Sequence, residues 1–452
     1  MNPKNRRQFL KSCCHVGAAG MAAHMTRLAP MSLFAQSSGD YKALVCVFLF
    51  GGNDANNMIV PVDSRYAAYQ AMRGSVALAA PNPGNPDAVI AAGSSGYGLH
   101  SRLPLLKARY DTNRVAMVFN VGTLFEPLTR TEYRNGTKRR PVNLFSHSDQ
   151  TTQWQTSIAT GGATGWGGRL NDVTQSLNGG TLPPGITVNS GTAMFLNGVT
   201  TQGMNYSNPS SFGLTTFGES ATRNARLLTP LQNILTFDTG VQLVGAANGV
   251  LGDSMRSAQA INAAVQSAPP IPTGITFPAT GLGNQLRQVA QIMAVQGALN
   301  MNRQIFFAGT GGFDNHENLV AAQNGLMSGF DQAVDAFMKT LEARGQYDKA
   351  TLFTESEFNR TGDANANVGT DHAWGSHCFV VGGAVQGGTH GTFPTHQLNG
   401  PDDAGDRGYW IPTTATDQYG ATLGRWFGAS DAQLASIFPN LANFPSGALS
   451  FV

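Results

Sequence analysis

Residues 41–54 read YKALVCVFLFGGND, and this stretch decides the fold class. Its first ten residues are apolar apart from Lys42, without the alternation of a strand that has one face in water. Such a run is typical of a strand buried on both faces, because helices cover both sides of its sheet. Gly51 and Gly52 end the run, so the polar Asp54 is expected close to the end of the strand.

Similar short apolar runs recur along the chain and alternate with stretches of helical periodicity. The runs predict strands at 114–121, 304–308, 350–354 and 378–381. Apolar residues at steps of three and four predict helices at 103–110, 227–265, 283–301, 319–344, 416–427 and 432–438. This alternation predicts an α/β fold, with a central, mostly parallel sheet that has helices on both faces.

Residues 171–282 interrupt this rhythm. The part at 171–217 is rich in Gly, Thr, Ser and Asn, which predicts a loop-rich or β insertion. The proline-rich part at 267–282 indicates a linker that returns the chain to the sheet. We therefore expect a single α/β domain over residues 36–452, with an insertion and linker at 171–282.

The chain begins with features of an export signal. Residues 5–11 read NRRQFLK, the twin-arginine pattern that an export receptor recognises. The weakly apolar stretch at 13–29 is too short and too polar to span a membrane. We expect a signal peptide over residues 1–35 that engages the twin-arginine translocation machinery, and a periplasmic or secreted protein that is not membrane-spanning after cleavage. The alternative is a disordered basic N-terminus.

Charge and cysteine content limit the classes of partner. Removal of residues 1–35 would leave 24 basic and 27 acidic residues, so the remaining chain has no strong field of either sign. No nucleic acid partner is expected, because such binding needs concentrated positive charge. Cys46 and Cys378 would remain, each within an apolar run. They are interpreted as buried thiols, although an oxidising compartment would also permit a disulfide.

Acidic and imidazole side chains lie next to several predicted strands. Asp54 follows the first strand, residues 311–316 (GGFDNH) follow the third and residues 355–360 (ESEFNR) follow the fourth. Residues 369–377 (GTDHAWGSH) come just before the fifth. In an open α/β sheet, ligands bind outside the carboxyl ends of the strands. We therefore expect these segments to meet at one edge of the sheet.

A site for divalent metal ions explains this combination of residues. Carboxylate oxygens and neutral imidazole nitrogens suit zinc, manganese, iron or magnesium, and the neighbouring glycines allow sharp turns beside the ligands. Two ions about 3.5–4 Å apart would need about six protein ligands. The chain supplies that number with Asp54, Asp314, His316, Glu357, Asp371 and His372.

Several of these residues also have a purely structural interpretation. Asp54 could cap a helix or a turn. Asp314 could cap the helix that follows it, with His316 on the surface. His377 could be a core histidine or one that supports a ligand.

Two further patterns leave alternatives open. Glu355 and Glu357 share a face if the predicted strand continues to Glu357, whereas only one reaches the site if the strand ends earlier; we favour Glu357. The run Lys138-Arg139-Arg140 is typical of a solvated surface, and the alternative is that an arginine there binds an anion.

Taken together, these motifs resemble a known family. The resemblance rests on the twin arginines, GGND at 51–54, GGFDNH at 311–316, FTESEFNRT at 353–361 and GTDHAWGSH at 369–377. Over nearly all of its predicted mature length, the chain is similar to the bacterial exported family catalogued as domain of unknown function 1501. It departs from the family pattern at Asn359, where the family usually has glycine.

That family is grouped by fold with the alkaline phosphatase and sulfatase superfamily. The resemblance implies a mixed sheet with helices on both faces and a two-metal site at its carboxyl edge. It implies as ligands the first-strand Asp54, the pair Asp314 and His316, the strand-end Glu357, and the late pair Asp371 and His372. It also implies a nucleophile that opens a helix, for which the nearest candidate is Ser148 in FSHSDQ at 145–150. A helix N-terminus there would lower the pKa of the hydroxyl and hold an anion.

Two functions from different classes remain. The first is an exported metal-dependent hydrolase that acts on phosphate or sulfate esters, of either small molecules or polysaccharides. The second is a non-catalytic exported protein on the same scaffold, which binds a polysaccharide or a protein partner through residues 171–217.

Overall fold

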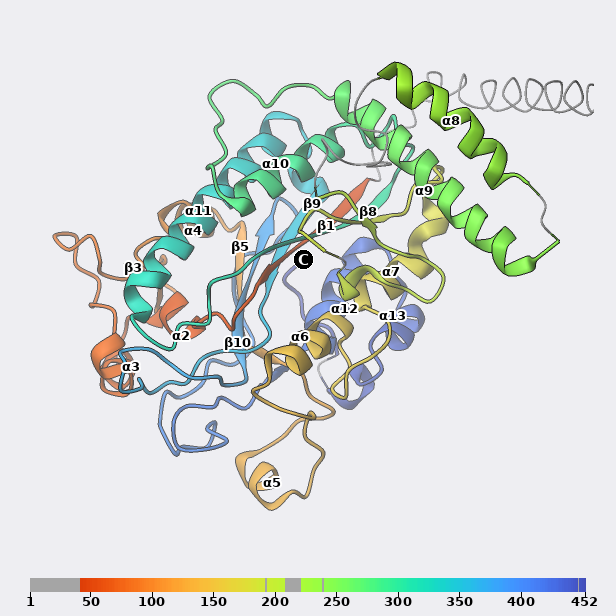
Figure 1. Cartoon of the computed structure of the whole chain (residues 1–452). Helices are drawn as coiled ribbons and strands as arrows, with labels where there is room; N and C mark the ends of the chain where they lie inside the picture. Colours follow the sequence, from red (N-terminus) through yellow and green to blue (C-terminus); the bar gives the residue numbers. More distant parts are fainter. Residues whose placement is uncertain (1–40, 192, 208–220, 238–239, 446) are drawn as a thin grey trace, which may run out of the picture.

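The computed structural model describes residues 41–191, 193–207, 221–237, 240–445 and 447–452. The expected signal peptide at 1–35 lies outside the described residues. The described chain is an α/β structure in which a large mixed sheet has helices on both faces (Figure 1). No helix in the described part is both long enough and apolar enough to cross a membrane.

The central sheet has nine strands. Their bounds are β1 Lys42–Leu49, β5 Val115–Gly122, β6 Gly185–Thr187, β7 Met204–Asn205, β8 Arg303–Thr310, β9 Ala350–Glu355, β10 Ser376–Gly382, β11 Gly388–His390 and β12 Thr414–Ala415. The strand order is β11-β5-β10-β9-β1-β8-β6-β7, and β12 also pairs with β5. A separate three-stranded sheet has the order β2-β4-β3, with β2 at Ile59–Pro61, β3 at Ile90–Ala91 and β4 at Tyr97–Leu99.

One long strand runs against the others. Strand β1 is parallel to both β8 and β9, whereas β10 is antiparallel to both β5 and β9. The beginning of β10 therefore lies at the edge of the sheet where the parallel strands end. The pattern of residues 378–381 predicts a buried strand without indicating its direction, and this direction brings the preceding segment to the carboxyl edge.

Strand β1 explains why helices must cover both faces of the sheet. Ala43, Val45, Val47 and Leu49 pack into one hydrophobic cluster, whereas the alternate residues Leu44, Cys46 and Phe48 pack into another. Complete burial of a Val, Leu or Phe side chain contributes roughly 1.5–3 kcal/mol. A strand with two buried faces is therefore stable only between two layers of helices.

The described chain has twelve α-helices, and most of them form these two layers. The bounds are α2 Ala55–Met58, α3 Tyr66–Arg73, α4 Pro104–Asp111, α5 Arg130–Asn135, α6 His147–Thr156, α7 Trp166–Thr174, α8 Ala221–Leu235, α9 Gln242–Gln266, α10 Gly281–Ala294, α11 Leu319–Ala343, α12 Thr416–Phe427 and α13 Asp431–Ile437. Helices α4, α10 and α11 contribute to the first cluster, and α6, α7, α12 and α13 to the second (Figure 1).

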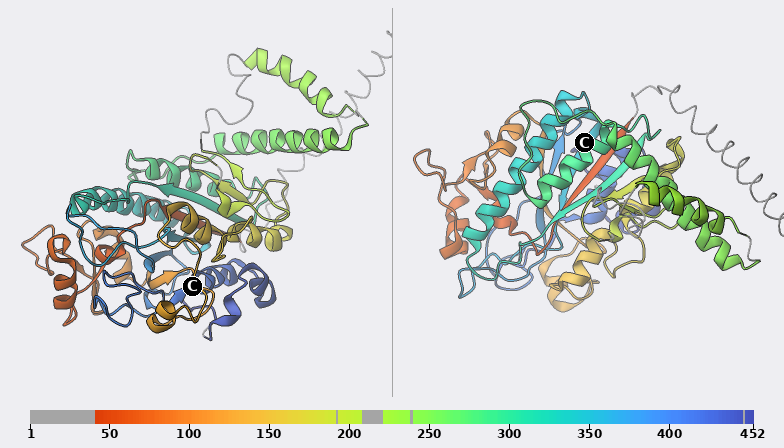
Figure 2. Two further views of the ribbon diagram at one scale, coloured as in Figure 1. Left: turned by 60° about the horizontal axis from the view of Figure 1, so that its bottom comes forward. Right: turned by 45° about the horizontal axis from the view of Figure 1, so that its top comes forward.

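Residues 171–282 differ in part from the predicted insertion. Strands β6 and β7 extend the central sheet beyond β8, so this part belongs to the core architecture. The helical stretch predicted at 227–265 is two helices, and α8 and α9 form a hairpin that extends away from the body (Figure 2). Residues 208–217 of the predicted insertion lie outside the described part of the chain.

Cys46 and Cys378 are free and buried. Cys46 lies on β1 and Cys378 on β10, and β9 lies between these strands. Two strand spacings amount to about 9.5 Å. A disulfide needs Cα atoms within about 7 Å of each other, so the structure favours the buried thiols over the disulfide.

A buried histidine in β10 makes the fold sensitive to acid. The His377 Nδ1 atom accepts a hydrogen bond from the Asn120 backbone amide at 3.0 Å, and its ring stacks on Phe393. Burial lowers the pKa of His377 to about 3. In the unfolded chain this histidine binds a proton near pH 6.5, whereas in the folded chain it stays neutral until about pH 3. The free energy of unfolding therefore falls as the pH drops below about 6.5.

We predict that His377→Asn reduces this pH dependence, because asparagine keeps an acceptor for the Asn120 amide but does not titrate. Between pH 7 and pH 5, the free energy of unfolding of the wild type should fall by about 2 kcal/mol more than that of the variant. Urea unfolding at the two pH values measures the difference. Equal losses in both proteins would contradict the prediction.

Candidate metal centre

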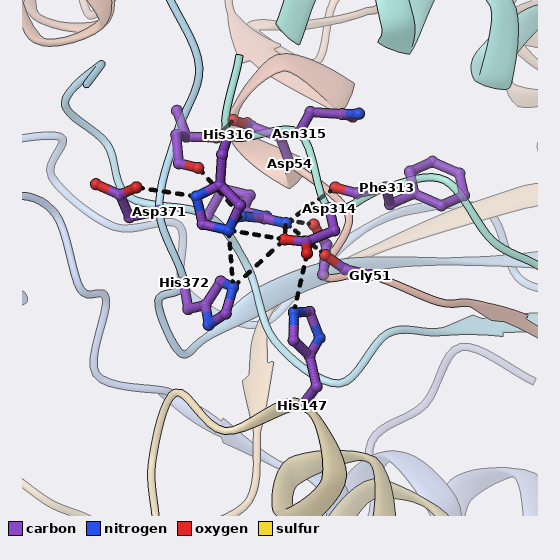
Figure 3. A network of polar contacts seen from close by, with 12 residues as sticks. Gly51, Asp54, His147, Phe313, Asp314, Asn315, His316, Asp371 and His372 are labelled. Atoms are coloured by element: carbon purple, nitrogen blue, oxygen red, sulfur yellow. Dashed lines mark hydrogen bonds and ion pairs between the residues drawn. The ribbon is translucent and has the colours of Figure 1, made fainter. Parts of the chain in front are cut away.

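Four segments that are distant in sequence meet at the carboxyl edge of the central sheet (Figure 3). Asp314 and His316 follow β8, and His147 is the first residue of α6. His372 lies just before β10 and reaches this edge because β10 is antiparallel. Glu357 follows β9.

Three of these residues form a group that can hold a metal ion. His147, Asp314 and His372 each offer a ligand atom, and these atoms lie within 4.8 Å of one another. Asp314 Oδ1 is 3.3 Å from His372 Nε2, and Asp314 Oδ2 is 3.5 Å from His147 Nε2. His316 Nε2 joins them at 2.9 Å from Asp314 Oδ1 and 3.1 Å from His372 Nε2.

The partners of the three rings decide where their protons are. His147 Nδ1 is 2.8 Å from Glu357 Oε1, His316 Nδ1 is 3.1 Å from Asp371 Oδ1, and His372 Nδ1 is 2.8 Å from the Phe145 carbonyl oxygen. Each of these oxygens accepts a hydrogen bond, so we assign the proton of each neutral ring to Nδ1. The three Nε2 atoms then present lone pairs, as in histidines whose other ring nitrogen is held by a supporting acceptor.

This arrangement fits a cation. Nε2 lone pairs that face each other at 3.1 Å repel unless a proton or a metal ion lies between them. Two nitrogens about 2.05 Å from a tetrahedral zinc ion are about 3.3 Å apart, close to the spacings found here. The Nε2 atom of His147 is also shielded from solvent and, apart from the 3.5 Å approach to Asp314, has no hydrogen-bond partner among the described residues.

The surrounding charges favour the same interpretation. Asp314, Asp371 and Glu357 outnumber the guanidinium groups of Arg360 and Arg407, so with neutral imidazoles the site has an excess of negative charge. Burial alone would raise the pKa of Asp314, but its contact with Arg360 lowers the value overall. Burial alone would raise the pKa of Asp371, but Arg407, 2.6 Å away, together with Asn365 and His316 lowers it to about 2. Both carboxylates are therefore ionised at neutral pH.

The two outer rings differ in basicity. The hydrogen bond to Glu357 raises the pKa of His147. Burial lowers the pKa of His372. The hydrogen bond with the Phe145 carbonyl opposes this effect, but the net pKa is still below the ordinary value. The ring of His372 also stacks on Phe358, with centroids 4.7 Å apart, which fixes its orientation.

Arg360 holds the loops of the site together. Its side chain is fully buried and donates to the carbonyl oxygens of Gly51, Gly52, Phe313 and Thr370 at 2.7–3.2 Å. It also contacts the Asp314 carboxylate. The guanidinium thus joins the ends of β1 and β8 to the segment before β10.

Asp54 has a place different from the one predicted. Its carboxylate forms a fully buried ion pair with Arg73 at 2.7 Å and accepts from the Thr370 hydroxyl at 3.2 Å. It also caps α2 by accepting from the Asn57 amide. The carboxylate is therefore outside the group of atoms that face one another, which among the described residues consists of His147, Asp314 and His372.

Glu355 and Glu357 lie in different surroundings, as expected if the strand ends before Glu357. Strand β9 ends at Glu355, whose carboxyl group lies beside Cys46 and Trp166 in the core, where burial raises its pKa to about 8. Glu357 instead reaches the site, where Oε1 accepts from the Gly51 amide and from His147, both at 2.8 Å. Glu357 thus orients a histidine, and we do not count it among the converging ligand atoms.

The residue that the sequence analysis missed is His147. It directly precedes the predicted nucleophile, and the only signal was its position at the start of a helix after an early strand. Ser148 is exposed, and its Oγ lies 3.2 Å from Ser146 Oγ, the cap of α6. Among the described contacts, none joins Ser148 to Asp314 or to the three histidines. His377 is a core residue of β10, as described above.

Asn359, which stands where the related pattern has glycine, has a structural role. Its Oδ1 atom accepts hydrogen bonds from the Ala55 amide at 2.9 Å and from the Arg360 amide at 2.8 Å. The side chain therefore fastens the loop after β9 to the beginning of α2. None of its hydrogen bonds in the described structure goes to a histidine of the site.

Comparison with known proteins identifies one family. The profile of the family described as "Protein of unknown function (DUF1501)" matches residues 41–404. This range includes every residue of the candidate metal centre. Among curated proteins, no relative matches the chain.

We predict that Arg360→Lys destabilises the protein by at least about 3 kcal/mol, because a single ammonium group cannot reach the carbonyl oxygens that the guanidinium joins and leaves them unpaired in the core. The matched control is Arg425→Lys, which changes an exposed pair with Asp431. We expect it to change the free energy of unfolding by less than about 1 kcal/mol. Urea unfolding measures both values, and similar losses would show that Arg360 has no special role.

Proposed function

The chain belongs to the DUF1501 family, and from this premise we propose that it is an exported metal-dependent hydrolase of phosphate or sulfate esters. The observation that carries the proposal is the convergence of three histidine Nε2 atoms on the Asp314 carboxylate at the carboxyl edge of the sheet. Ligands of α/β proteins bind at this edge. The mixed sheet with helices on both faces is also consistent with an alkaline phosphatase-like fold, which we propose for this chain.

The proposed ligands are Asp314, His147 and His372, with His316 as the fourth group. A divalent cation bound there would polarise an ester oxygen and neutralise charge that develops on it. Zinc fits the tetrahedral spacings and the imidazole-rich ligand set, while manganese and iron are compatible with the same donors. Asp371 and Glu357 keep their histidines in the tautomer that can bind the ion.

We propose Ser148 as the attacking hydroxyl. It is exposed in the first turn of the ten-residue helix α6 and follows His147 directly. The backbone amides at the N-terminus of this helix favour an anion and lower the pKa of a hydroxyl placed there. Ser146 is already used as the helix cap, which leaves Ser148 as the available serine of this turn.

Export remains part of the proposal. A twin-arginine signal at 1–35 would carry a protein that is already folded, so the metal ion could enter the site before export. This order suits a site whose ligands come from three separate segments, because they converge only in the folded chain.

We predict that the purified protein binds one zinc or manganese ion per chain. Asp314→Asn and His372→Gln should weaken binding at least about 100-fold, because each removes a ligand. Glu357→Gln should weaken it about 10- to 100-fold, because it changes the acceptor that orients His147. His390→Gln is the control, since this residue lies on β11 outside the cluster. Titration calorimetry measures all four variants, and a wild type without bound metal or metal affinity would overturn the proposal.

We predict that the metal-loaded protein hydrolyses an aryl phosphate or an aryl sulfate. Asp314→Asn and His372→Gln should abolish turnover. Ser148→Ala should lower kcat at least about 1,000-fold with unchanged metal affinity, because it removes only the nucleophile. Full activity of Ser148→Ala would assign the attack to water. If the metal-loaded protein hydrolyses neither ester, the result would favour the alternative function, a non-catalytic binding protein.

A further inference from the structure

A basic cavity adjoins the candidate metal centre. It has a volume of about 460 Å³ and is lined by Tyr133, Gly136, Lys138, Arg140, Pro141 and Leu144. Leu144 is followed by Phe145, whose carbonyl oxygen is 2.8 Å from Nδ1 of His372. Because Leu144 lines the cavity and the next residue contacts His372, the cavity lies close to the metal centre.

The positive charge beside this cavity is only partly neutralised. Lys138 has carboxylate partners, with Glu132 at 3.0 Å and Glu126 at 3.9 Å. In contrast, Arg139 and Arg140 are exposed, and no carboxylate among the described residues forms an ion pair with either. Two guanidinium groups are therefore available for an anion from outside the chain: Arg140 lines the cavity, and Arg139 precedes it in the chain without belonging to the lining.

Aromatic rings hold both arginines without using their polar donors. The guanidinium carbon of Arg139 lies 3.8 Å from the centre of the Phe125 ring, and that of Arg140 lies 5.1 Å from the centre of the Tyr133 ring. Contact with a ring face restricts the guanidinium group while its N–H donors in the plane stay free. These donors have the fork geometry that binds sulfate and phosphate oxygens in pairs.

We propose that this cavity binds a second sulfate or phosphate group of the same substrate molecule whose ester group lies at the metal centre. This inference rests on the proposed function and names its substrate class, a sugar ester that carries several anionic groups. The volume is within the range of small-molecule sites, so it suits one substituted sugar unit. Because residues 36–452 contain 24 basic and 27 acidic residues, the positive site is local and does not suit a long run of phosphates.

Binding of non-hydrolysable polymers tests the cavity independently of catalysis. Dextran sulfate, phosphorylated dextran and neutral dextran are titrated at low ionic strength into wild type, the double variant Arg139→Gln/Arg140→Gln and the control double variant Arg226→Gln/Arg287→Gln. Arg226 on α8 and Arg287 on α10 are exposed and do not line the cavity, so the control removes the same number of positive charges. We expect the double variant to bind the anionic polymers about tenfold more weakly, the control to match wild type, and neutral dextran not to bind. The preferred polymer distinguishes sulfate from phosphate.

The outcomes separate this proposal from the proposed function. Unchanged affinity in the double variant, or equal loss in the control, overturns the cavity proposal even if the protein hydrolyses esters. Loss of affinity in the double variant but not in His372→Gln supports the cavity, whether or not esters are hydrolysed. For an active enzyme, the double variant should have a raised KM for a sulfated or phosphorylated sugar ester, and an unchanged kcat and KM for the aryl ester.

Discussion

A single buried guanidinium joins three of the four segments from which the candidate metal centre is built; the start of α6, which carries His147, is the fourth. Arg360 donates to backbone carbonyls at the end of β1, after β8 and before β10, and it also contacts Asp314. A buried charge is costly unless it is paired and its donors are used. Arg360 meets both conditions only when these loops are in place, so the loop conformations depend on one another.

The direction of β10 gives the second constraint. A short antiparallel bridge joins Arg360 to His372, and the neighbouring Thr361 amide donates to the Asp371 carbonyl. The chain therefore passes from the loop after β9 to the beginning of β10 along the same edge of the sheet. Parallel pairing of β10 would have placed His372 at the opposite edge, away from Asp314.

The supporting residues make the site rigid before any ligand binds. Glu357, Asp371 and the Phe145 carbonyl each hold one histidine by its Nδ1 atom. Asp54 supports the site indirectly. It pairs with Arg73 and accepts a hydrogen bond from Thr370, which fixes the loop that carries Asp371 and His372. Preorganised ligands bind an ion without a further cost of ordering side chains.

The sequence by itself determined the α/β architecture and the segments that carry the chemistry, because buried strands, amphipathic helices and glycine-bounded loops are local patterns. The five predicted strands and most predicted helices are present. Strands β6 and β7 lie in the stretch predicted as a loop-rich or β insertion, whose composition indicated neither their bounds nor their place in the central sheet. Only the tertiary structure decided which atoms converge. It added His147, which no local pattern distinguishes from a surface histidine, and it paired Asp54 with Arg73. Such contacts depend on strand direction and on pairing between loops far apart in the chain, and neither is encoded in local periodicity.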